Sequence, residues 1–238
     1  MIDIHSHIIY DVDDGPSTIR DSICMVLDAG KLGINTIVAT PHYNKALYDD
    51  YYVSHNFKEL TSRVKDCNID LYCGYEVFLT KDTAYDISEN SDLTLNKSRY
   101  LLFELPFDNI PEYTRSVLRT LNFNNFTPIL AHPERYRKFI KNFSEFISIV
   151  ELGCLIQIDA ASIIGVYGNE VKKFAKKLLK LDMVHCVASD AHCSSDYLNW
   201  YIPAYEQVKA WAGREKADEL FNLNPKLIIE NSSMNGDV

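Results

Sequence analysis

Two histidines near the start of the chain have the residue type and the spacing of metal ligands. His5 and His7 end the run Met1-Ile2-Asp3-Ile4-His5-Ser6-His7, which is typical of a short buried strand. Because side chains alternate along a strand, both imidazoles point to one face and Ser6 to the other. Neutral imidazole is a common ligand for zinc, manganese, iron and nickel. The pair therefore favours a divalent cation, although such a pair alone does not establish a site.

The same arrangement recurs along the chain, where apolar runs end on side chains that can bind a metal ion. In chain order these residues are His42, Glu76, Glu104, His132, Asp190 and His192. A single histidine or glutamate after a strand is usually a turn residue or a satisfied polar group. Six of seven predicted strands that end in this way are hard to obtain by chance. Taken together, these strand ends predict one metal site.

Periodicity and turn residues divide the chain into alternating strands and helices. We expect strands over 1–7, 36–40, 71–75, 100–103, 127–131, 154–159 and 183–188. We expect helices over 17–32, 54–66, from 111 onward, and over 140–152, 169–181 and 203–231. Ser17 is the predicted N-cap of the first helix and Gly33 its stop signal.

Seven strands that alternate with helices predict parallel pairing and, at this length, a closed or nearly closed α/β barrel rather than an open sheet. Such barrels carry their active sites at the C-terminal ends of the strands. Folding should therefore gather the ligand-type residues in one pocket. His55 and His185 are interpreted as structural, because one lies in a predicted helix and the other inside a predicted strand. Asp3 and Asp159 are ambiguous and are left out of the predicted site.

Composition limits the classes of function. The 238 residues are 47% hydrophobic and 24% charged, an ordinary soluble profile that predicts a single domain over 1–238. With 24 Lys plus Arg against 33 Asp plus Glu, the formal charge is −9, which disfavours nucleic acid and anionic membrane surfaces as partners. The sequence has neither an apolar stretch long enough to enter a membrane nor the pattern of a signal peptide. We expect a cytoplasmic protein.

The six cysteines do not form a Cys-x-x-Cys pair, so the sequence gives no sign of a zinc knuckle or a redox motif. A cysteine phosphatase needs an arginine six positions after its nucleophile. None of the six cysteines has one there. Phosphatase chemistry in this chain would therefore proceed without a cysteinyl-phosphate intermediate.

The motifs taken together resemble the polymerase and histidinol phosphatase (PHP) superfamily, in particular its bacterial tyrosine-phosphatase branch encoded with capsular or exopolysaccharide genes. Besides the opening run and the terminal Asn224-Pro225-Lys226, the motifs that carry the resemblance are Val12-Asp13-Asp14-Gly15, Ala39-Thr40-Pro41-His42, Gly74-Tyr75-Glu76-Val77, Ala131-His132-Pro133-Glu134-Arg135-Tyr136 and Ala188-Ser189-Asp190-Ala191-His192. They extend over nearly the whole chain.

The resemblance implies a distorted seven-stranded (β/α)7 TIM-like barrel with three divalent metal ions, usually manganese or iron and sometimes zinc. It implies one ion at His5, His7, Glu76 and Asp190. It implies a second ion at Glu76, Glu104 and His132, and a third toward Asp14, His42 and His192. Asp13 could serve in place of Asp14.

The resemblance also implies a protein-tyrosine phosphatase that acts on an autophosphorylated bacterial tyrosine kinase controlling polysaccharide export. Two alternatives are a small-molecule phosphomonoesterase, for example for histidinol phosphate, and a non-catalytic metal-binding module. Clustered cations suit this chemistry, because they supply a metal-bound hydroxide as the nucleophile and neutralise charge on the phosphoryl group. A metal-bound water or His42 could protonate the leaving phenol.

Arg135 is the predicted phosphate-binding cation, because its planar guanidinium can hold two phosphate oxygens and it follows His132 by three residues. Members of the branch often carry a second arginine shortly after the Asp-x-His motif. This chain has Tyr197 in that place. We therefore expect Tyr197 to border the substrate. Three alternatives follow from the missing arginine: weaker binding of phosphate, compensation by Arg137 or Lys45, or a different substrate.

Overall fold

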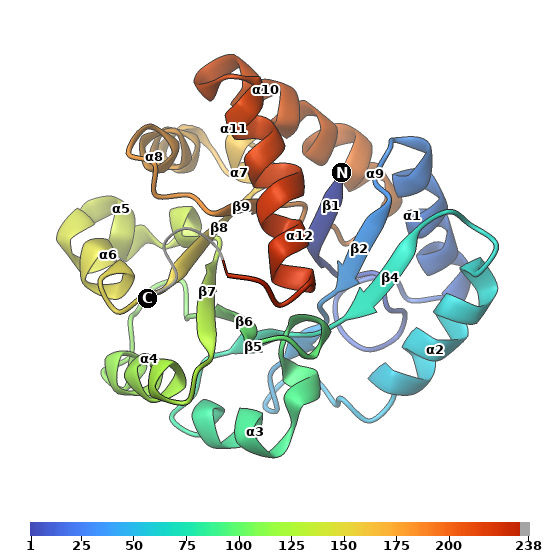
Figure 1. Ribbon diagram of the computed structural model, residues 1–238, viewed down its shortest axis with the longest axis horizontal. Coiled ribbons are helices and arrows are strands. Elements are labelled where there is room, and N and C mark those ends of the chain that lie inside the picture. The colour runs from blue at the N-terminus through green and yellow to red at the C-terminus, as the bar shows by residue number, and fades with distance from the viewer. Residues whose placement is uncertain (234–238) are drawn as a thin grey trace.

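The computed structural model describes residues 1–233 and places short parallel strands at the centre, with helices around them (Figure 1). The strands are β1 (Ile2–Ser6), β2 (Thr36–Ala39), β3 (His42–Tyr43), β4 (Asp70–Cys73), β5 (Glu76–Phe78), β6 (Tyr100–Glu104), β7 (Thr127–Ala131), β8 (Leu155–Asp159) and β9 (Cys186–Ala188). They form two parallel sheets, of three strands in the order β1-β2-β4 and of six strands in the order β3-β5-β6-β7-β8-β9. The predicted α/β class and parallel pairing are confirmed.

Residues 1–233 contain nine short strands and not the seven predicted, because two runs resume as a further strand after a break. The run that begins with β2 stops before Pro41 and resumes as β3, and the run of β4 stops at Gly74 and resumes as β5. Proline has no N–H to donate to a neighbouring strand. At Gly74 the chain passes so close to Thr94 that a Cβ would lie 2.9 Å from the Thr94 carbonyl oxygen. Each interrupted run therefore begins in one sheet and ends in the other.

The two sheets also meet on the opposite side, between β1 and the segment after β9. The His5 carbonyl accepts a hydrogen bond from the Asp190 N–H at 3.0 Å, and the His7 N–H donates to the Ala191 carbonyl at 2.9 Å. Ser6 and Ala191 form an isolated parallel bridge there. These bonds hold the end of β1 against the Asp190 segment, which brings ligand-type residues 185 positions apart next to each other.

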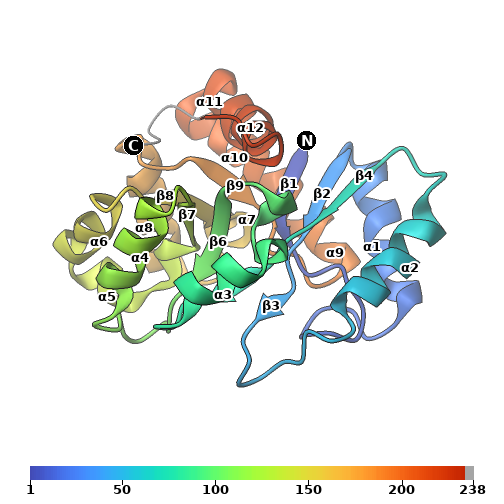
Figure 2. The ribbon, with the colours of Figure 1, turned by 60° about the horizontal axis from the view of Figure 1, so that its bottom comes forward.

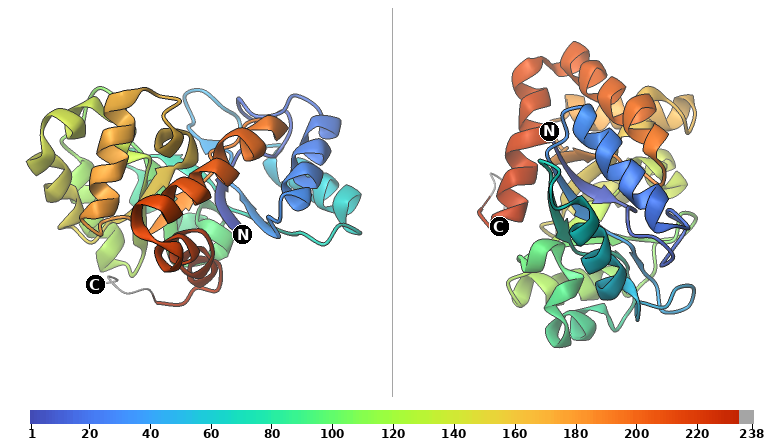
Figure 3. Two further views of the ribbon diagram at one scale, coloured as in Figure 1. Left: turned by 90° about the horizontal axis from the view of Figure 1, so that it is seen from above. Right: turned by 90° about the vertical axis from the view of Figure 1, so that its right-hand side faces the viewer.

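The helices that cover the sheets are α1 (Ile19–Lys31), α2 (Val53–Val64), α3 (Thr83–Glu89), α4 (Thr114–Phe123), α5 (Arg137–Lys141), α6 (Phe143–Val150), α7 (Ala160–Ile164), α8 (Asn169–Lys180), α9 (Ser194–Asp196), α10 (Ile202–Ala212), α11 (Arg214–Asp218) and α12 (Asn224–Ile229). Figure 3 shows them from two further sides, with the blue α1 beside the teal α2. Within residues 1–233, none of these helices has the length and apolar character needed to cross a membrane.

Several predicted helix bounds differ from the observed ones for local reasons. Thr18, not Ser17, caps α1, because the Thr18 side chain accepts a hydrogen bond from the Asp21 N–H. The helix predicted over 140–152 is two helices, α5 and α6, with Asn142 in a non-helical conformation between them. The last predicted strand, 183–188, is shortened to β9. Gly33 follows the end of α1 with a φ of 84°, as its predicted role as a stop signal requires.

Below the strand ends, the interior is filled by side chains from alternate strand positions. This inner cluster consists of Ile4, Val38, Leu95, Tyr100, Leu102, Ile129, Ala131, Leu155, Cys186, Ala188 and Ile228. Ile228 comes from α12, which Figure 2 shows close to the N-terminal end of β1. The larger apolar cluster lies between the strands and the outer helices. The strands are therefore packed on both faces, which gives the polar residues at their ends a rigid support.

We expect Gly74→Ala to lower the free energy of unfolding by about 1–3 kcal/mol, because its Cβ would be forced against backbone atoms of Thr94 and Leu95 that cannot move independently. Gly30→Ala is the matched control. Its Cβ would meet only the flexible end of the Ile69 side chain, and alanine favours the helix α1. Chemical denaturation of both variants measures the difference. Equal stabilities would contradict the close approach at Gly74.

Candidate metal centre

A pocket of about 330 Å³ opens where the strand ends of both sheets come together. It is lined by Asp14, His42, Asn44, Leu47, Tyr48, Glu76, Phe78, Glu104, Leu105, Pro106, Phe107, His132, Arg135, Tyr167, Asp190 and His192. His5 and His7 lie beneath it and are fully buried. The structure thus brings together every residue that the sequence analysis proposed as a metal ligand.

The first group of ligand-type atoms is entirely buried and contains His5, His7, Glu76 and Asp190. The Nε2 atoms of His5 and His7 lie 3.4 Å apart, on one side of β1 as the alternation predicts. A Glu76 oxygen is 3.3 Å from the His5 Nε2, and an Asp190 oxygen lies 3.4 Å from each of the two Nε2 atoms. Two imidazoles and two carboxylates that converge in this way form a donor set suited to a divalent cation.

A second group contains His7, Asp14, His42 and His192. An Asp14 oxygen lies 3.2 Å from the His192 Nε2 and 3.5 Å from the His42 Nε2. The neighbouring Asp13 has another role, because its carboxylate accepts from the His7 Nδ1 at 2.7 Å and from the His42 N–H at 3.1 Å. Of the two candidates left open by the sequence, Asp14 lies among the ligand-type atoms, and Asp13 orients His7.

The third group contains His42, Glu76 and Glu104, so Glu76 takes part in two groups. The His42 Nδ1 lies 3.0 Å from a Glu76 oxygen and 3.5 Å from a Glu104 oxygen. His132 approaches the same place, with its Nε2 2.7 Å from the other Glu76 oxygen. Glu76 is therefore shared by two of the three groups and also contacts His132.

Two buried imidazole nitrogens without hydrogen-bond partners bear on whether this donor set fits a metal ion. The buried Nδ1 of His42 faces two carboxylate oxygens but makes no hydrogen bond within the described residues, and the buried Nδ1 of His132 also lacks a partner there. Buried polar groups are normally satisfied. A cation in this cluster would bind an imidazole lone pair that otherwise has no partner. The donor set thus fits metal ions better than it fits a self-contained hydrogen-bond network.

Charges within the groups shift the pKa values strongly. Burial alone would lower the pKa of His5, but the negative charges of Glu76 and Asp190 outweigh burial and raise it to about 9. Burial also opposes the charged form of His42, yet the adjacent Glu104 and Glu76 carboxylates raise its pKa to about 10. A hydrogen bond with His192 lowers the pKa of Asp14 to about 2. In the absence of a cation, protons on the imidazoles supply the positive charge that the carboxylates require.

Both ring nitrogens of His42 face carboxylates, with the Nε2 toward Asp14 and the Nδ1 toward Glu76 and Glu104. This geometry suits a ligand. It leaves His42 without a nitrogen directed at a leaving group, so the predicted catalytic role of His42 gains no support.

The backbone is strained at two of the positions. His132 has a φ of 38° and Asp190 a φ of 51°, values in the left-handed region that residues other than glycine rarely adopt. Such conformations persist only where the surroundings impose them, and they concentrate at functional sites. At Asp190 the hydrogen bond from its N–H to the His5 carbonyl helps to impose the conformation.

Arg135 lies in the pocket, as the sequence predicts. Its Nη1 donates to Asp190 at 2.9 Å and to Asp159 at 3.1 Å. The guanidinium carbon is 4.8 Å from the centre of the Phe107 ring and 4.4 Å from that of Tyr167. The two rings and two carboxylates fix the guanidinium next to the clustered ligand-type atoms, while 22% of the Arg135 side-chain surface remains exposed.

The predicted substrate contact of Tyr197 is wrong in this structure. Tyr197 is fully buried, and its hydroxyl is 2.7 Å from the Ser6 Oγ, on the side of β1 that faces away from the two histidines. Tyr197 begins the π-helical segment Tyr197–Tyr201, and its ring packs into the apolar core. Of the two residues proposed to compensate, Lys45 pairs with Asp86 at 2.9 Å, outside the pocket lining. Arg137 lines a neighbouring cavity that shares Phe107, Arg135 and Tyr167 with the pocket.

Sequence reasoning missed Phe107, Gln157 and Tyr167, which support the ligand-type groups together with Asp13, Tyr48 and Asp159. It had considered Asp13 only as a possible ligand and had left Asp159 out as ambiguous. The sequence contained a signal for Asp159, because this residue ends a strand at the same edge of the sheet as the ligand-type residues. The excluded histidines lie elsewhere: His55 is exposed on α2, and the His185 Nδ1 accepts from the Ile156 N–H.

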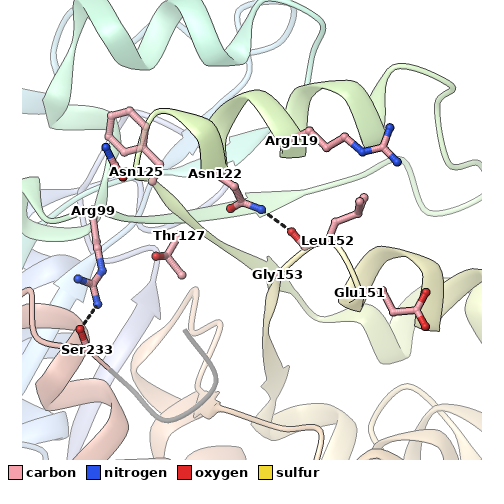
Figure 4. A pocket seen from close by; sticks show the side chains of 10 residues that line it. Arg99, Arg119, Asn122, Asn125, Thr127, Glu151, Leu152, Gly153 and Ser233 are labelled. Atoms are coloured by element: carbon pink, nitrogen blue, oxygen red, sulfur yellow. Dashed lines mark hydrogen bonds between the residues drawn. The ribbon is translucent and has the colours of Figure 1, made fainter. Parts of the chain in front are cut away.

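A larger cavity, of about 610 Å³, lies at the opposite end of the strands, where β6 and β7 begin (Figure 4). Arg99 and Arg119 contribute to it, and Asn122 donates a hydrogen bond to the Leu152 carbonyl across it. Its lining residues include one carboxylate, Glu151, and no histidine. It therefore lacks the donor set found at the other end, despite its size.

Comparison with known proteins agrees with this arrangement. A family model described as capsular polysaccharide synthesis, CpsB/CapC, matches residues 1–230. The tyrosine-protein phosphatase YwqE of Bacillus subtilis is 36% identical over 196 residues, which cover 81% of this chain and 77% of that protein. The tyrosine-protein phosphatase CpsB of Streptococcus pneumoniae is 32% identical over 238 residues, which cover 96% and 98%.

Solved structures extend the comparison to the fold. A crystal structure from work on YwqE and CpsB, described as metal-dependent tyrosine phosphatases, has a TM-score of 0.92 at 33% identity, covering 99% of this chain and 96% of that one. The histidinol phosphate phosphatase of Lactococcus lactis subsp. lactis, solved with zinc, has a TM-score of 0.59 at 14% identity, covering 92% of this chain and 94% of that one, and shares the fold alone. The family match over almost the whole chain and the identity to its curated members lead to one conclusion: this chain belongs to the CpsB/CapC capsular polysaccharide synthesis family.

Proposed function

We propose that this chain is a metal-dependent protein-tyrosine phosphatase that hydrolyses the phosphate ester of phosphotyrosine. One observation carries the proposal: the pocket combines three groups of histidine and carboxylate atoms with the fixed guanidinium of Arg135. Phosphoryl transfer needs a nucleophile and a positive environment for the non-bridging oxygens, and this combination can supply both. The names of the curated relatives supply the substrate class.

We propose that the pocket holds three divalent ions and that these are manganese, with iron or zinc as alternatives that the donor set also accepts. His5, His7, Glu76 and Asp190 would hold the first ion. Glu76, Glu104 and His132 would hold the second, and Asp14, His42 and His192 the third. Bound cations of this kind lower the pKa of a coordinated water and neutralise phosphoryl charge.

The chain's own residues would bind and orient the substrate. Arg135 can place its remaining N–H groups on phosphate oxygens, because the bonds to Asp159 and Asp190 occupy only its Nη1. Its attraction grows as charge spreads over the phosphoryl oxygens, so it favours the transition state over the bound ester. Arg135 would carry this role alone among the lining residues, because the position of the expected second arginine is the buried Tyr197.

Aromatic walls suit a phosphotyrosine ring. Tyr48 stacks on His42 with 5.4 Å between ring centres, and Phe107 stacks on His132 at 5.7 Å. Leu47 and Phe78 complete an apolar border around the charged floor. Offset or edge-on contacts between aromatic rings stabilise a bound ring by about 0.5–1.5 kcal/mol each beyond the area they bury. The border thus favours an aromatic ester over a small polar one.

We propose that the substrate is an autophosphorylated bacterial tyrosine kinase that regulates capsular or exopolysaccharide synthesis, in accord with the family description. The protein acts in the cytoplasm as one domain over 1–238, of which residues 234–238 lie outside the described part.

We further propose that the two sheets form one interrupted, distorted seven-stranded barrel, because they share the interrupted runs and are hydrogen-bonded between His5 and Asp190.

Exhaustive chelation should abolish hydrolysis of a phosphotyrosine peptide, and added Mn²⁺ should restore it, because the proposed nucleophile depends on a bound cation. Released phosphate and metal content are measured on the same sample. Histidinol phosphate is the comparison substrate, and we expect it to be hydrolysed much more slowly than the peptide. Full activity without metal would overturn the metal mechanism, whereas faster turnover of histidinol phosphate would transfer the proposal to a small-molecule phosphatase.

Arg135→Ala should lower kcat/KM about 10²–10³-fold while metal content stays unchanged, because the lost guanidinium acts on developing phosphoryl charge. Arg135→Lys should rescue poorly, since an ammonium cannot replace the planar fork. Arg137→Ala is the matched control, because Arg137 lines the adjacent cavity and not the pocket. Near-normal kinetics of Arg135→Ala together with a strong loss in Arg137→Ala would reassign the phosphate contact.

Mn²⁺ binding to metal-free protein should release protons. The pKa values of His5 and His42, about 9 and about 10, lie above a working pH of about 7.5, so these rings are protonated without metal and must become neutral as ligands. Affinity for Mn²⁺ should therefore rise with pH until those values are reached. Calorimetry in two buffers of different ionisation enthalpy counts the released protons, and identical heats in both buffers would refute the release.

A further inference from the structure

A closed ring of polar contacts connects the first metal-ligand group to Arg135 behind the pocket. We infer that Gln157 and Asp159 are positioning residues that couple cation binding at His5 to phosphate binding at Arg135. The inference rests on the proposed function for the roles of His5 and Arg135. What it adds is a connection between His5 and Arg135 through Gln157 and Asp159, two side chains that are fully buried on β8.

The direction of each hydrogen bond follows from the chemistry of Asp159. An ionised carboxylate can only accept hydrogen bonds, so Asp159 accepts from the Gln157 amide nitrogen at 3.0 Å and from the Arg135 Nη1 at 3.1 Å. The Gln157 side chain is thereby fixed with its oxygen pointing the other way. That oxygen lies 2.9 Å from the His5 Nδ1.

The orientation of Gln157 determines which nitrogen of His5 is available. An amide oxygen accepts, so the His5 Nδ1 must carry the proton and donate it to Gln157. The lone pair of His5 is then on Nε2, which faces the Glu76 and Asp190 oxygens of the first ligand group. Partners of this kind fix both the tautomer and the ring plane of a ligating histidine.

The ring closes through Asp190. One Asp190 oxygen accepts from the Arg135 Nη1 at 2.9 Å, and the other lies 3.4 Å from the His5 Nε2. The complete circuit is therefore His5, Gln157, Asp159, Arg135 and Asp190. A cation that draws His5 and Asp190 together acts on both ends of the path that holds Arg135.

The surroundings leave this ring little freedom. The Asp159 N–H donates to the buried Glu134 at 2.9 Å, so the backbone that carries the carboxylate is itself held. Phe107 and Tyr167 lie on the guanidinium of Arg135 at 4.8 and 4.4 Å. Because its parts cannot relax independently, a disturbance at Gln157 should reach both the cation and the phosphate.

A simpler interpretation is that Gln157 and Asp159 only satisfy buried polar groups. That role predicts a loss of stability and no change in the affinities of the folded protein. The coupling predicts changes in Mn²⁺ and phosphate affinity that depend on which bond is cut. The two interpretations can therefore be separated by binding measurements.

The test compares the wild type with Gln157→Met, Asp159→Asn and the control Gln207→Met, which changes the only other glutamine, on α10. Mn²⁺ affinity is measured by competition with a graded chelator. Affinity of the Mn²⁺-loaded protein for inorganic phosphate is measured by calorimetry. Thermal unfolding checks that each variant folds.

Gln157→Met should weaken Mn²⁺ binding about 10–100-fold, because His5 loses the partner that fixes its tautomer. It should also weaken phosphate binding at saturating Mn²⁺. Asp159→Asn should weaken phosphate binding about tenfold or more with a smaller effect on Mn²⁺, because it keeps the acceptor for Gln157 and loses the charged partner of Arg135. Gln207→Met should match the wild type.

Wild-type affinities for both Mn²⁺ and phosphate in folded Gln157→Met and Asp159→Asn would overturn the inference. If Gln157→Met does not fold, the volume-preserving Asp159→Asn decides alone by the same criterion. A wild type that binds Mn²⁺ and phosphate but does not hydrolyse phosphotyrosine would refute the proposed function. The binding comparison would then still decide whether Gln157 and Asp159 couple the two sites.

Discussion

The structure depends on the compensation of buried negative charge at the ends of its strands. Glu76 and Asp190 are almost completely buried, and isolated carboxylates in such surroundings would be very costly. Imidazoles surround them, and Arg135 pairs with Asp190. The pKa of Glu76 is held well below its usual value, with burial opposed by the charge of His5 and the hydrogen bond of His132. An arrangement that keeps carboxylates ionised and imidazoles close to them is prepared to exchange protons for cations.

The interruptions of the sheet determine where these charges lie. His42 and Glu76 are the first residues of β3 and β5, the halves that follow the breaks at Pro41 and Gly74, and they pair with each other in register. Before each break, the run forms β2 or β4 in the three-stranded sheet. After the break, it forms β3 or β5 in the six-stranded sheet, and its first residue, His42 or Glu76, lines the pocket. His132 and Asp190 follow two other strand ends, and both have a left-handed φ. The packed interior beneath them keeps these positions from relaxing.

The sequence was sufficient to predict the α/β class, the parallel strands and the ligand-type residues at the strand ends, because alternation and strand-end position are local patterns. Asp14 was expected only from the resemblance to the family. The sequence could not predict the two interrupted strands, since the break at Gly74 depends on its close approach to Thr94. Tyr197 was misplaced because its burial and its contact with Ser6 join segments 191 positions apart, which no local pattern predicts. Gln157 escaped notice because an amide is not a typical metal ligand, and its role emerges only from its contacts with His5 and Asp159.

We propose that three cations would occupy this pocket and that Glu76, which belongs to two of the ligand-type groups, would contact two of them. The most direct measurement is anomalous diffraction at the manganese absorption edge from crystals grown with Mn²⁺. The account predicts three anomalous peaks in the pocket, with the Glu76 carboxylate in contact with two of them. A pocket without anomalous density at saturating Mn²⁺, or a single peak remote from Glu76, would contradict it.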